Sequence, residues 1–329
     1  MKKYITAILL VSGLLTFAAC SNDNDQNSSY QLPLNEGDMM VTMDDLVYEE
    51  DFGQTRSYLS RDLKTHMWVE LDSMRVYDND LHKYDRYKFN WKDDTHDVGV
   101  FSRVHANSFL SSDPKWALFP KNDVHGGHWE QDDETSVATT FATMMIGTDE
   151  NGNFRPMKFD VAYQASDAGH ANPLFADRLP RWGEVELVDG GQKLKTRLSY
   201  LTGVLRLQLA NTQGKADLIK VQLFDGTTAL PVAGRFNTTL AINDVKQAGA
   251  SLSADDYEPG SVATELLVDL TGATGSIVVY VPLVTTTVPV DIVVSASNDG
   301  GQTWTEFKRF KNKTVARGKV YGNATEYVF

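Results

Sequence analysis

Short apolar runs with a two-residue period constrain this chain more than any other feature. Residues 203–209 read GVLRLQL, in which Arg206 and Gln208 alternate with apolar side chains. That period is typical of a half-buried β-strand. Similar runs recur at spacings of about ten residues between Gly, Asn and Asp, and long helical periods are nearly absent. The pattern predicts an all-β chain built of β-sandwiches rather than a βαβ fold.

The same reasoning places the other strands and one tight hairpin. Strands are predicted at residues 39–43, 46–48, 218–224, 276–281, 290–296 and 304–310. The turn Asn298–Gly301 predicts that the last two form a hairpin. It lies inside Ser297–Trp304, a complete match to the Asp-box S-x-D-x-G-x-T-W of sialidase-like propellers. Since a propeller repeats its unit and this one occurs once, a stable turn is the better interpretation.

The N-terminus carries a secretion signal. Lys2 and Lys3 precede an apolar run from Ile5 to Phe17, and Ala18-Ala19 lead directly to Cys20. This is the lipobox pattern, so residues 1–19 are predicted to be a lipoprotein signal peptide and Cys20 the acylated first residue. Two or three acyl chains such as palmitate hold a protein firmly to a membrane. The alternative is an ordinary signal peptide followed by a chance cysteine.

The composition limits how the chain can be stabilised and which partners it can bind. Cys20 is the only cysteine, so a mature chain without disulfides must be stabilised by packing. Without Lys2 and Lys3 the chain has 29 basic against 44 acidic residues, which disfavours nucleic acid as a partner. Residues 20–36 are polar and are predicted to be a flexible tether.

A change of composition suggests two domains. All histidines, and all tryptophans except Trp304, lie before residue 183. We therefore predict an N-terminal sandwich at 37–183 and a C-terminal sandwich at 184–329.

Catalytic and metal motifs are weak. The sequence has no G-x-S-x-G, no phosphate-binding glycine loop and no H-E-x-x-H, so no enzyme and no cofactor are predicted. His125 and His128 have a spacing that could bind a metal, but a glycine-rich polar loop accounts for them as well, and no metal site is predicted. Trp116, Trp129 and Trp182 could stack on sugars, although tryptophans of a sandwich usually belong to the core.

The order of several segments is more specific than any one of them. LSYLTGVLRLQLAN (198–211), LIKVQLFDGTTALPVAGRFN (218–237), SIVVYVPL (276–283) and ARGKVYGNATEYVF (316–329) follow the lipoprotein start. Together they resemble the fimbrillin family, the type V pilins and related lipoproteins of Bacteroidales. The resemblance covers residues 172–329 well and the N-terminal half loosely. The acidic start of the tether also resembles that of surface-exported lipoproteins of Bacteroidota.

The resemblance implies a fold of two transthyretin-like sandwiches and a role as a pilus subunit. The precursor would be lipid-anchored in the outer membrane and exposed at the cell surface, and the assembled subunit would be part of a fimbrium. In that family an arginine-specific protease removes the N-terminal segment with its first strand, and a strand of another subunit takes its place. The candidate cleavage sites are Arg56 and Arg61, after an apolar stretch at 39–48 that would be the removable strand. Alternatively, Arg56 is an ordinary loop arginine and the lipid anchor persists.

The family's stalk subunits donate a strand from the C-terminal region. Here Lys319–Phe329 is expected to be the domain's own last strand, so the sequence leaves tip, stalk and anchor roles open. The partners implied are other pilin subunits, the protease, the outer membrane and a host or glycan surface. The main alternative function is a surface glycan-binding lipoprotein of a nutrient-uptake system.

Overall fold

The structure is a computed structural model. It describes residues 37–44, 46–48, 73–78, 83–90, 98–104, 114–119, 127–129, 141–148, 153–158, 179–211, 215–239 and 257–328. All of these belong to one compact unit that spans residues 34–329. Nearly all of them lie in strands, which confirms the predicted all-β fold class.

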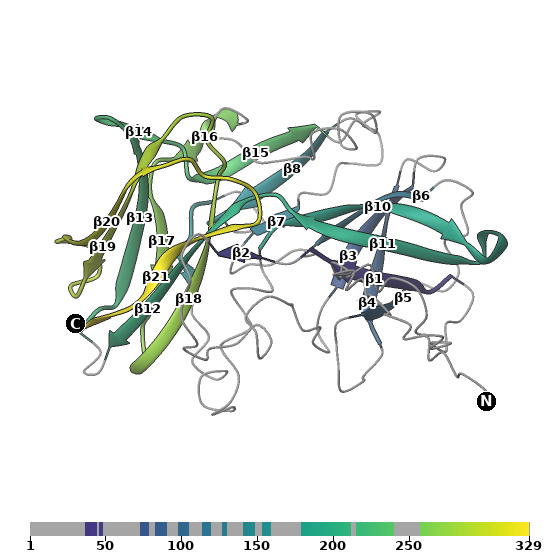
Figure 1. Cartoon of the computed structure of the whole chain (residues 1–329), viewed down its shortest axis with the longest axis horizontal. Coiled ribbons are helices and arrows are strands. Elements are labelled where there is room, and N and C mark those ends of the chain that lie inside the picture. The colour runs from purple at the N-terminus through teal and green to yellow at the C-terminus, as the bar shows by residue number, and fades with distance from the viewer. Residues whose placement is uncertain are drawn as a thin grey trace, which may run out of the picture. The chain divides into compact units, whose positions relative to one another are not determined.

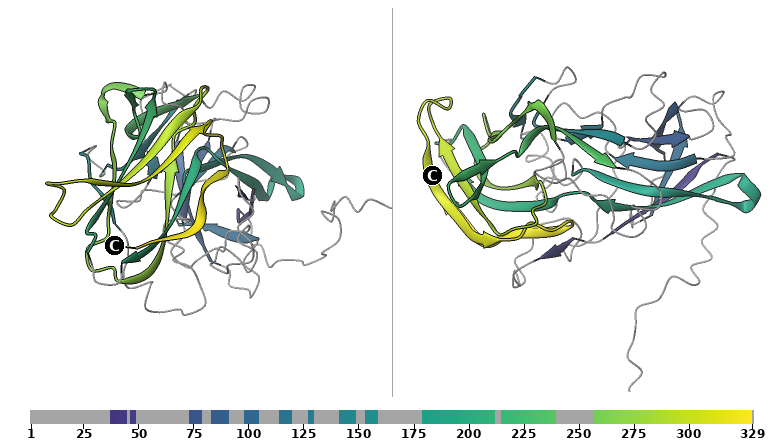
Figure 2. Two further views of the ribbon diagram at one scale, coloured as in Figure 1. Left: turned by 60° about the vertical axis from the view of Figure 1, so that its left-hand side comes forward. Right: turned by 90° about the horizontal axis from the view of Figure 1, so that it is seen from above.

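Seven strands form a sheet that closes on itself (Figure 1). In hydrogen-bonded order they are β1 (Met39–Met43), β11 (Lys193–Tyr200), β10 (Arg181–Val188), β6 (Pro114–Phe119), β3 (Ser73–Asp78), β4 (Lys83–Phe89) and β5 (Gly99–Arg103), which returns to β1. The strands β10 and β11 form a long hairpin that turns through a short 3-10 segment, η1 (Asp189–Gly191), as Figures 1 and 2 show. The first sheet is thus a closed barrel rather than an open sandwich layer.

Three further sheets contain most of the C-terminal half. One has the order β18 (Gly275–Leu283), β12 (Gly203–Asn211), β21 (Lys319–Val328), β2 (Val47–Tyr48). The second has the order β20 (Thr305–Lys313), β19 (Val290–Ser297), β13 (Leu218–Asp225), β17 (Leu266–Asp269), β9 (Met157–Lys158), with β14 (Thr228–Leu230) paired to β13. The third has the order β16 (Tyr257–Ala263), β15 (Ala233–Thr239), β8 (Phe141–Ile146), β7 (Gly127–Trp129).

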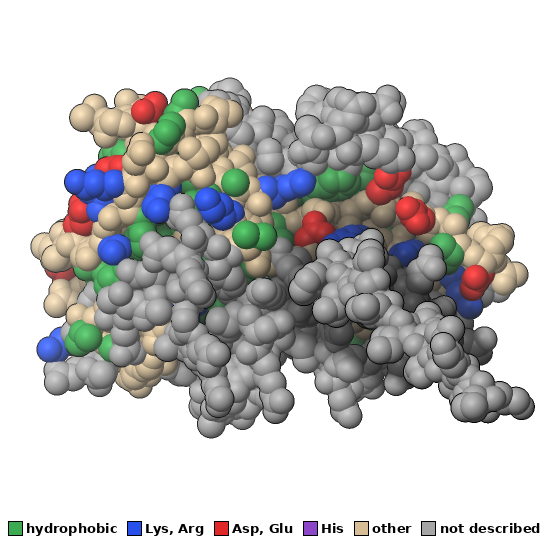
Figure 3. Space-filling model, in the orientation of Figure 1, with side chains coloured by type: hydrophobic (Ala, Val, Ile, Leu, Met, Phe, Trp, Pro, Cys, Tyr) green, Lys and Arg blue, Asp and Glu red, His purple; other side chains and the backbone are tan. Residues whose placement is uncertain are grey.

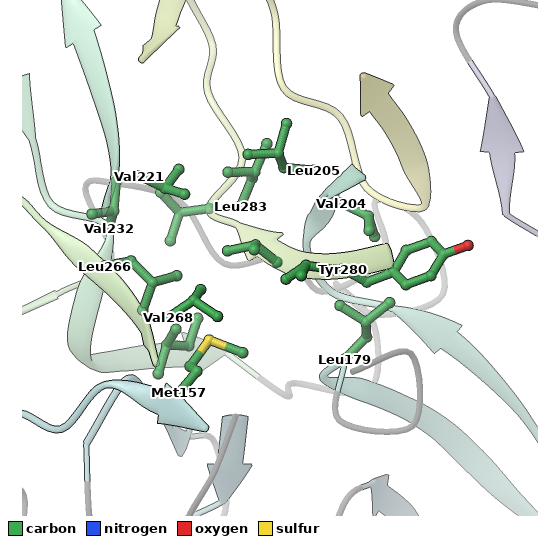
Figure 4. Packing of buried hydrophobic residues seen from close by; sticks show 14 of the residues in the cluster. Met157, Leu179, Val204, Leu205, Val221, Val232, Leu266, Val268, Tyr280 and Leu283 are labelled. Atoms are coloured by element: carbon green, nitrogen blue, oxygen red, sulfur yellow. The ribbon is translucent and has the colours of Figure 1, made fainter. Parts of the chain in front are cut away.

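Two clusters of buried side chains hold these sheets. The larger joins strands of the C-terminal sheets with the outer wall of the barrel, and Figure 4 shows Val221, Leu266 and Leu283 meeting within it. The smaller fills the barrel and includes Met39 and Phe101. Each buried aliphatic or aromatic side chain contributes about 1.5–3 kcal/mol relative to exposure. A chain whose only cysteine is Cys20 therefore has the packed core that it needs.

The predicted strands of the C-terminal half are confirmed, with one difference in exposure. The strand β13 alternates in burial more regularly than its sequence indicated, with Ile219 and Val221 fully buried. In β12, however, Arg206 is buried although its pattern predicted a polar outer face. The strand β12 is a central strand that pairs with β18 and β21, and Arg206 Nη2 lies 3.5 Å from Gln208 Oε1 on the same strand.

The division expected between residues 183 and 184 falls inside β10. Both β10 and β11 pair within the barrel, and the chain enters the next sheet at Gly203. Gly183 itself is in close packing, because a Cβ there would lie 2.3 Å from the carbonyl oxygen of Arg197. The short strands β2, β8 and β9 in turn pair with strands of the C-terminal half, and β7 pairs with β8. Two independent folding domains stay a prediction, and the sheets themselves change at 201–202.

The predicted Asp-box forms the turn between β19 and β20. The carboxylate of Asp299 accepts hydrogen bonds from the Thr303 backbone N–H (2.9 Å), the Thr303 hydroxyl (2.6 Å) and the Ser297 hydroxyl (2.8 Å). Gly300 and Gly301 have φ of 69° and 88°, which favours glycine. These bonds, with that from Thr303 largest, lower the pKa of Asp299 from 3.8 to about 2.

This lowered pKa predicts a loss of stability in acid. Because the folded-state pKa is depressed, the carboxylate stabilises the fold above about pH 4, and its contribution disappears as the pH falls toward about 2. Thermal melts across this range should show a steeper decline for the wild type than for Asp299→Asn. Equal pH dependence of the two proteins would contradict the assignment.

Candidate functional site

The strand β1 closes the barrel and is the candidate functional element. It pairs in parallel with β11, from Met39↔Leu194 to Met43↔Leu198, and antiparallel with β5, from Met39↔Phe101 to Val41↔Gly99. Without β1 the other six strands would form an open sheet with β5 and β11 at its edges. Residues 39–43 therefore form the strand that the sequence predicted, and this strand is hydrogen-bonded on both sides.

Side chains of β1 alternate between the barrel core and its outside. Met39 and Val41 are 0% exposed and belong to the barrel cluster, and Met43 packs against that cluster. Met40 and Thr42 are half-buried on the opposite face. The strand thus contributes apolar side chains to the core as well as main-chain hydrogen bonds.

The first end of β1 is held by Asp38. Its carboxylate accepts a hydrogen bond from the Ser102 hydroxyl of β5 at 2.5 Å, and Ser102 also bonds the side-chain amide of Asn90. Its backbone oxygen accepts from the Leu194 N–H at 3.0 Å. The preceding Gly37 donates to the Gln192 carbonyl at 2.7 Å, so this end contacts both neighbouring strands.

The second end is held by Asp44. Its carboxylate accepts hydrogen bonds from Arg197 Nε at 2.7 Å and from the Ser199 hydroxyl at 2.5 Å. Its backbone N–H donates to the Leu198 carbonyl at 2.8 Å. We call Asp38 and Asp44, with their partners Ser102, Arg197 and Ser199, the end clamps.

The same segment continues into the C-terminal sheets. Leu46 is 2% exposed and belongs to the larger core cluster. Val47 and Tyr48 form β2, which pairs in parallel with β21, and the Val47 N–H donates to the Gly318 carbonyl at 2.9 Å. Residues 37–48, the leading segment, therefore complete the barrel and also the edge of a second sheet.

The edge strand β20 differs from β1 because it carries charged side chains. Among the described strands β20 pairs only with β19, and it carries Lys308, Arg309, Lys311 and Lys313. Figure 3 shows basic side chains spread over the C-terminal strands. Charged residues, lysine above all, deter strand addition at an edge. The edge of β20 is therefore protected, whereas the place of β1 is lined by apolar side chains.

Most of the site residues that the sequence predicted lie outside the part of the chain that the structure describes. Cys20, Arg56, Arg61 and His125 lie outside the described residues, and the side chain of His128 is also outside them. Within the described ranges no three His, Cys, Asp or Glu side chains come together as metal ligands. Nor does the described part of the chain contain a helix of the length and apolarity that spans a bilayer.

Two of the three tryptophans considered for sugar stacking are core residues. Trp116 and Trp182 are 4% and 6% exposed and belong to the larger cluster, and Trp116 stacks on Tyr77 with ring centroids 5.2 Å apart. The core interpretation holds for these two, and the side chain of Trp129 lies outside the described set.

The end clamps were missed by sequence reasoning. Asp44 lies between the strands predicted at 39–43 and 46–48, and the sequence predicts no strand that contains Arg197 and Ser199. The available signal was the pair of acids that flanks an alternating apolar run at 38–44.

No family model and no curated protein matches this chain. Solved structures similar to it include a proposed cell adhesion protein from Bacteroides ovatus, 12% identical with a TM-score of 0.43, over 90% of this chain and 92% of that one. A fimbrial protein from Bacteroides ovatus is 10% identical with a TM-score of 0.34, over 89% of this chain and 48% of that one. A proposed adhesin from Bacteroides thetaiotaomicron is 8% identical with a TM-score of 0.32, over 85% and 81%.

The alternation of β1 gives a test of the site. Met39→Ala should lower the free energy of unfolding by about 2–5 kcal/mol, because a fully buried methionine leaves a cavity in the barrel. Met40→Ala, the same change on the half-buried outer face, should cost much less. Urea unfolding followed by tryptophan fluorescence measures both, and equal costs would show that β1 does not pack as described.

Proposed function

We propose that this chain is a fimbrillin-like surface lipoprotein that serves as a structural and adhesive subunit of a type V pilus. The observation that carries this proposal is the place of β1, between β5 and β11, with its apolar side chains in the barrel core. Subunits would assemble when a protease removes the leading segment and a strand of another subunit occupies the same position.

The physics of such an exchange is β-augmentation. An incoming strand would gain hydrogen bonds from β5 and β11, and alternate side chains would fill the positions of Met39 and Val41. Loss of the leading segment would also withdraw Leu46 from the larger cluster. The removable segment is thus coupled to two sheets, which supports a role in assembly rather than in catalysis.

The lipid anchor, the cleavage sites and the other partners are proposed from the sequence alone. Acylated Cys20 would anchor the precursor in the outer membrane, exposed at the cell surface, and the assembled subunit would belong to a fimbrium. Arg56 and Arg61 are the proposed cleavage sites for an arginine-specific protease. The other partners proposed are neighbouring pilin subunits and a host or glycan surface.

Treatment of the mature protein with an arginine-specific protease tests strand exchange. We expect a new N-terminus at residue 57 or 62, followed by uptake of a labelled peptide with the sequence of residues 37–48. The uncut protein should not take up this peptide, because its own strand is covalently attached and outcompetes it. N-terminal sequencing and fluorescence anisotropy measure the two steps.

The matched control is the double variant Arg56→Ala/Arg61→Ala. It should stay uncut and bind no peptide. Peptide uptake by this uncut variant at the rate of the cut protein would refute protease-triggered exchange, as would a cut wild type that never accepts the peptide.

The lipid anchor has its own test. Cys20→Ala removes the acylated thiol, so the expressed protein should move from the membrane fraction to the soluble fraction. Metabolic labelling with palmitate should mark the wild type alone. A Cys20→Ala protein that still sediments with membranes would show that the anchor lies elsewhere.

A further inference from the structure

We propose that the barrel binds a strand with a carboxylate at each end in preference to a strand without them, and that this strand comes from a chain other than a second copy of this one. This inference rests on the proposed strand exchange and specifies the partner. The required pattern is an acidic residue, three apolar residues at alternate positions, and a second acidic residue six positions after the first.

The apolar part of the pattern follows from the burial of β1. Met39 and Val41 are fully enclosed, and Met43 packs against the same cluster. Because side chains alternate, a shift of one residue would place Met40 and Thr42 in the core instead. An incoming strand therefore needs apolar side chains at the three alternate positions.

The acidic part follows from the charges that line the vacated place. On the β11 side, Arg197 and Ser199 converge on one carboxylate, that of Asp44. On the β5 side, Ser102 donates to Asp38, and the guanidinium of Arg103 lies against Gly37, whose Cβ position would be 3.0 Å from Arg103 Nη2. Removal of the leading segment would take the Asp44 carboxylate away from Arg197 and Ser199, and the Asp38 carboxylate away from Ser102.

The two clamps also fix the register. At about 3.3 Å per residue, six positions separate the carboxylates by about 20 Å, so a slipped strand meets at most one clamp. Hydrogen bonds alone would tolerate a slip of two residues, because the main chain is uniform. A carboxylate at each end of the strand disfavours this two-residue slip.

The pattern also excludes this chain as its own donor. Only residues 38–44 of the printed sequence have this pattern. It consists of an acid, apolar residues one, three and five positions later, and a second acid six positions after the first. That segment is the one removed by the proposed cleavage. The donor must therefore be a strand of a different chain.

The test uses the mature protein cut by the protease and peptides with the sequence of residues 37–48. Asp44→Asn in the peptide should weaken binding by about three- to tenfold, because one charge-assisted contact is lost. Thr42→Asn is the matched control on the outer face and should bind like the parent peptide. In Arg197→Gln protein, the difference between the parent peptide and the Asp44→Asn peptide should largely disappear.

The outcomes separate this inference from the proposed function. If the cut protein binds the parent and Asp44→Asn peptides equally, charge selection is wrong while strand exchange stands. If it binds no peptide, exchange fails, and release of the protein's own cut segment then tests the clamps: Asp44→Asn should release it faster than Thr42→Asn. If the cut protein polymerises with itself, the requirement for a different donor chain is wrong.

Discussion

The hydrogen bonding of β1 on both sides is the constraint on which the barrel depends. Its partner β11 lies far along the chain, since 155 residues separate Asp44 from Ser199. A parallel pair of this kind cannot form as a local hairpin, so closure of the barrel depends on a contact between residues far apart in the sequence. Closure removes both edges of the sheet at once, and the buried Met39 and Val41 make the closure an apolar contact as well.

The edges of the molecule differ in a way that directs association. The basic side chains of β20, with Asn312 at a φ of 56°, make that edge a poor partner for another strand. The net charge of the whole chain is −13 and does not indicate a basic strand, because the acidic residues elsewhere outnumber Lys308, Arg309, Lys311 and Lys313. An apolar position between two strands becomes accessible only if the leading segment departs. Protection of one edge by charge and occupation of the other position by a dedicated segment both oppose the addition of a further strand.

Local patterns predicted strands well and their partners poorly. The alternation of β13 and the turn Asn298–Gly301 are encoded within a few residues, and both are confirmed. Barrel closure was missed because pairing between β1 and β11 depends on the whole intervening chain. The predicted boundary between domains falls directly after Gly183, yet the missing Cβ of this glycine permits close approach to Arg197 inside one sheet. The clamps were missed for the same reason, since Asp44 acquires its meaning only from side chains more than a hundred residues away.

Covalent attachment, more than the contacts themselves, would control whether the leading segment stays. A tethered strand competes at an effective concentration of the order of millimolar, whereas a cut strand competes at its actual concentration. The contacts of β1 can therefore be strong enough to fold the precursor and still be replaceable once the connection is cut. The proposed cleavage would then act as a switch by cutting this connection. Under this view the end clamps add to the binding of the leading segment, and their greater effect is to determine which strand replaces it.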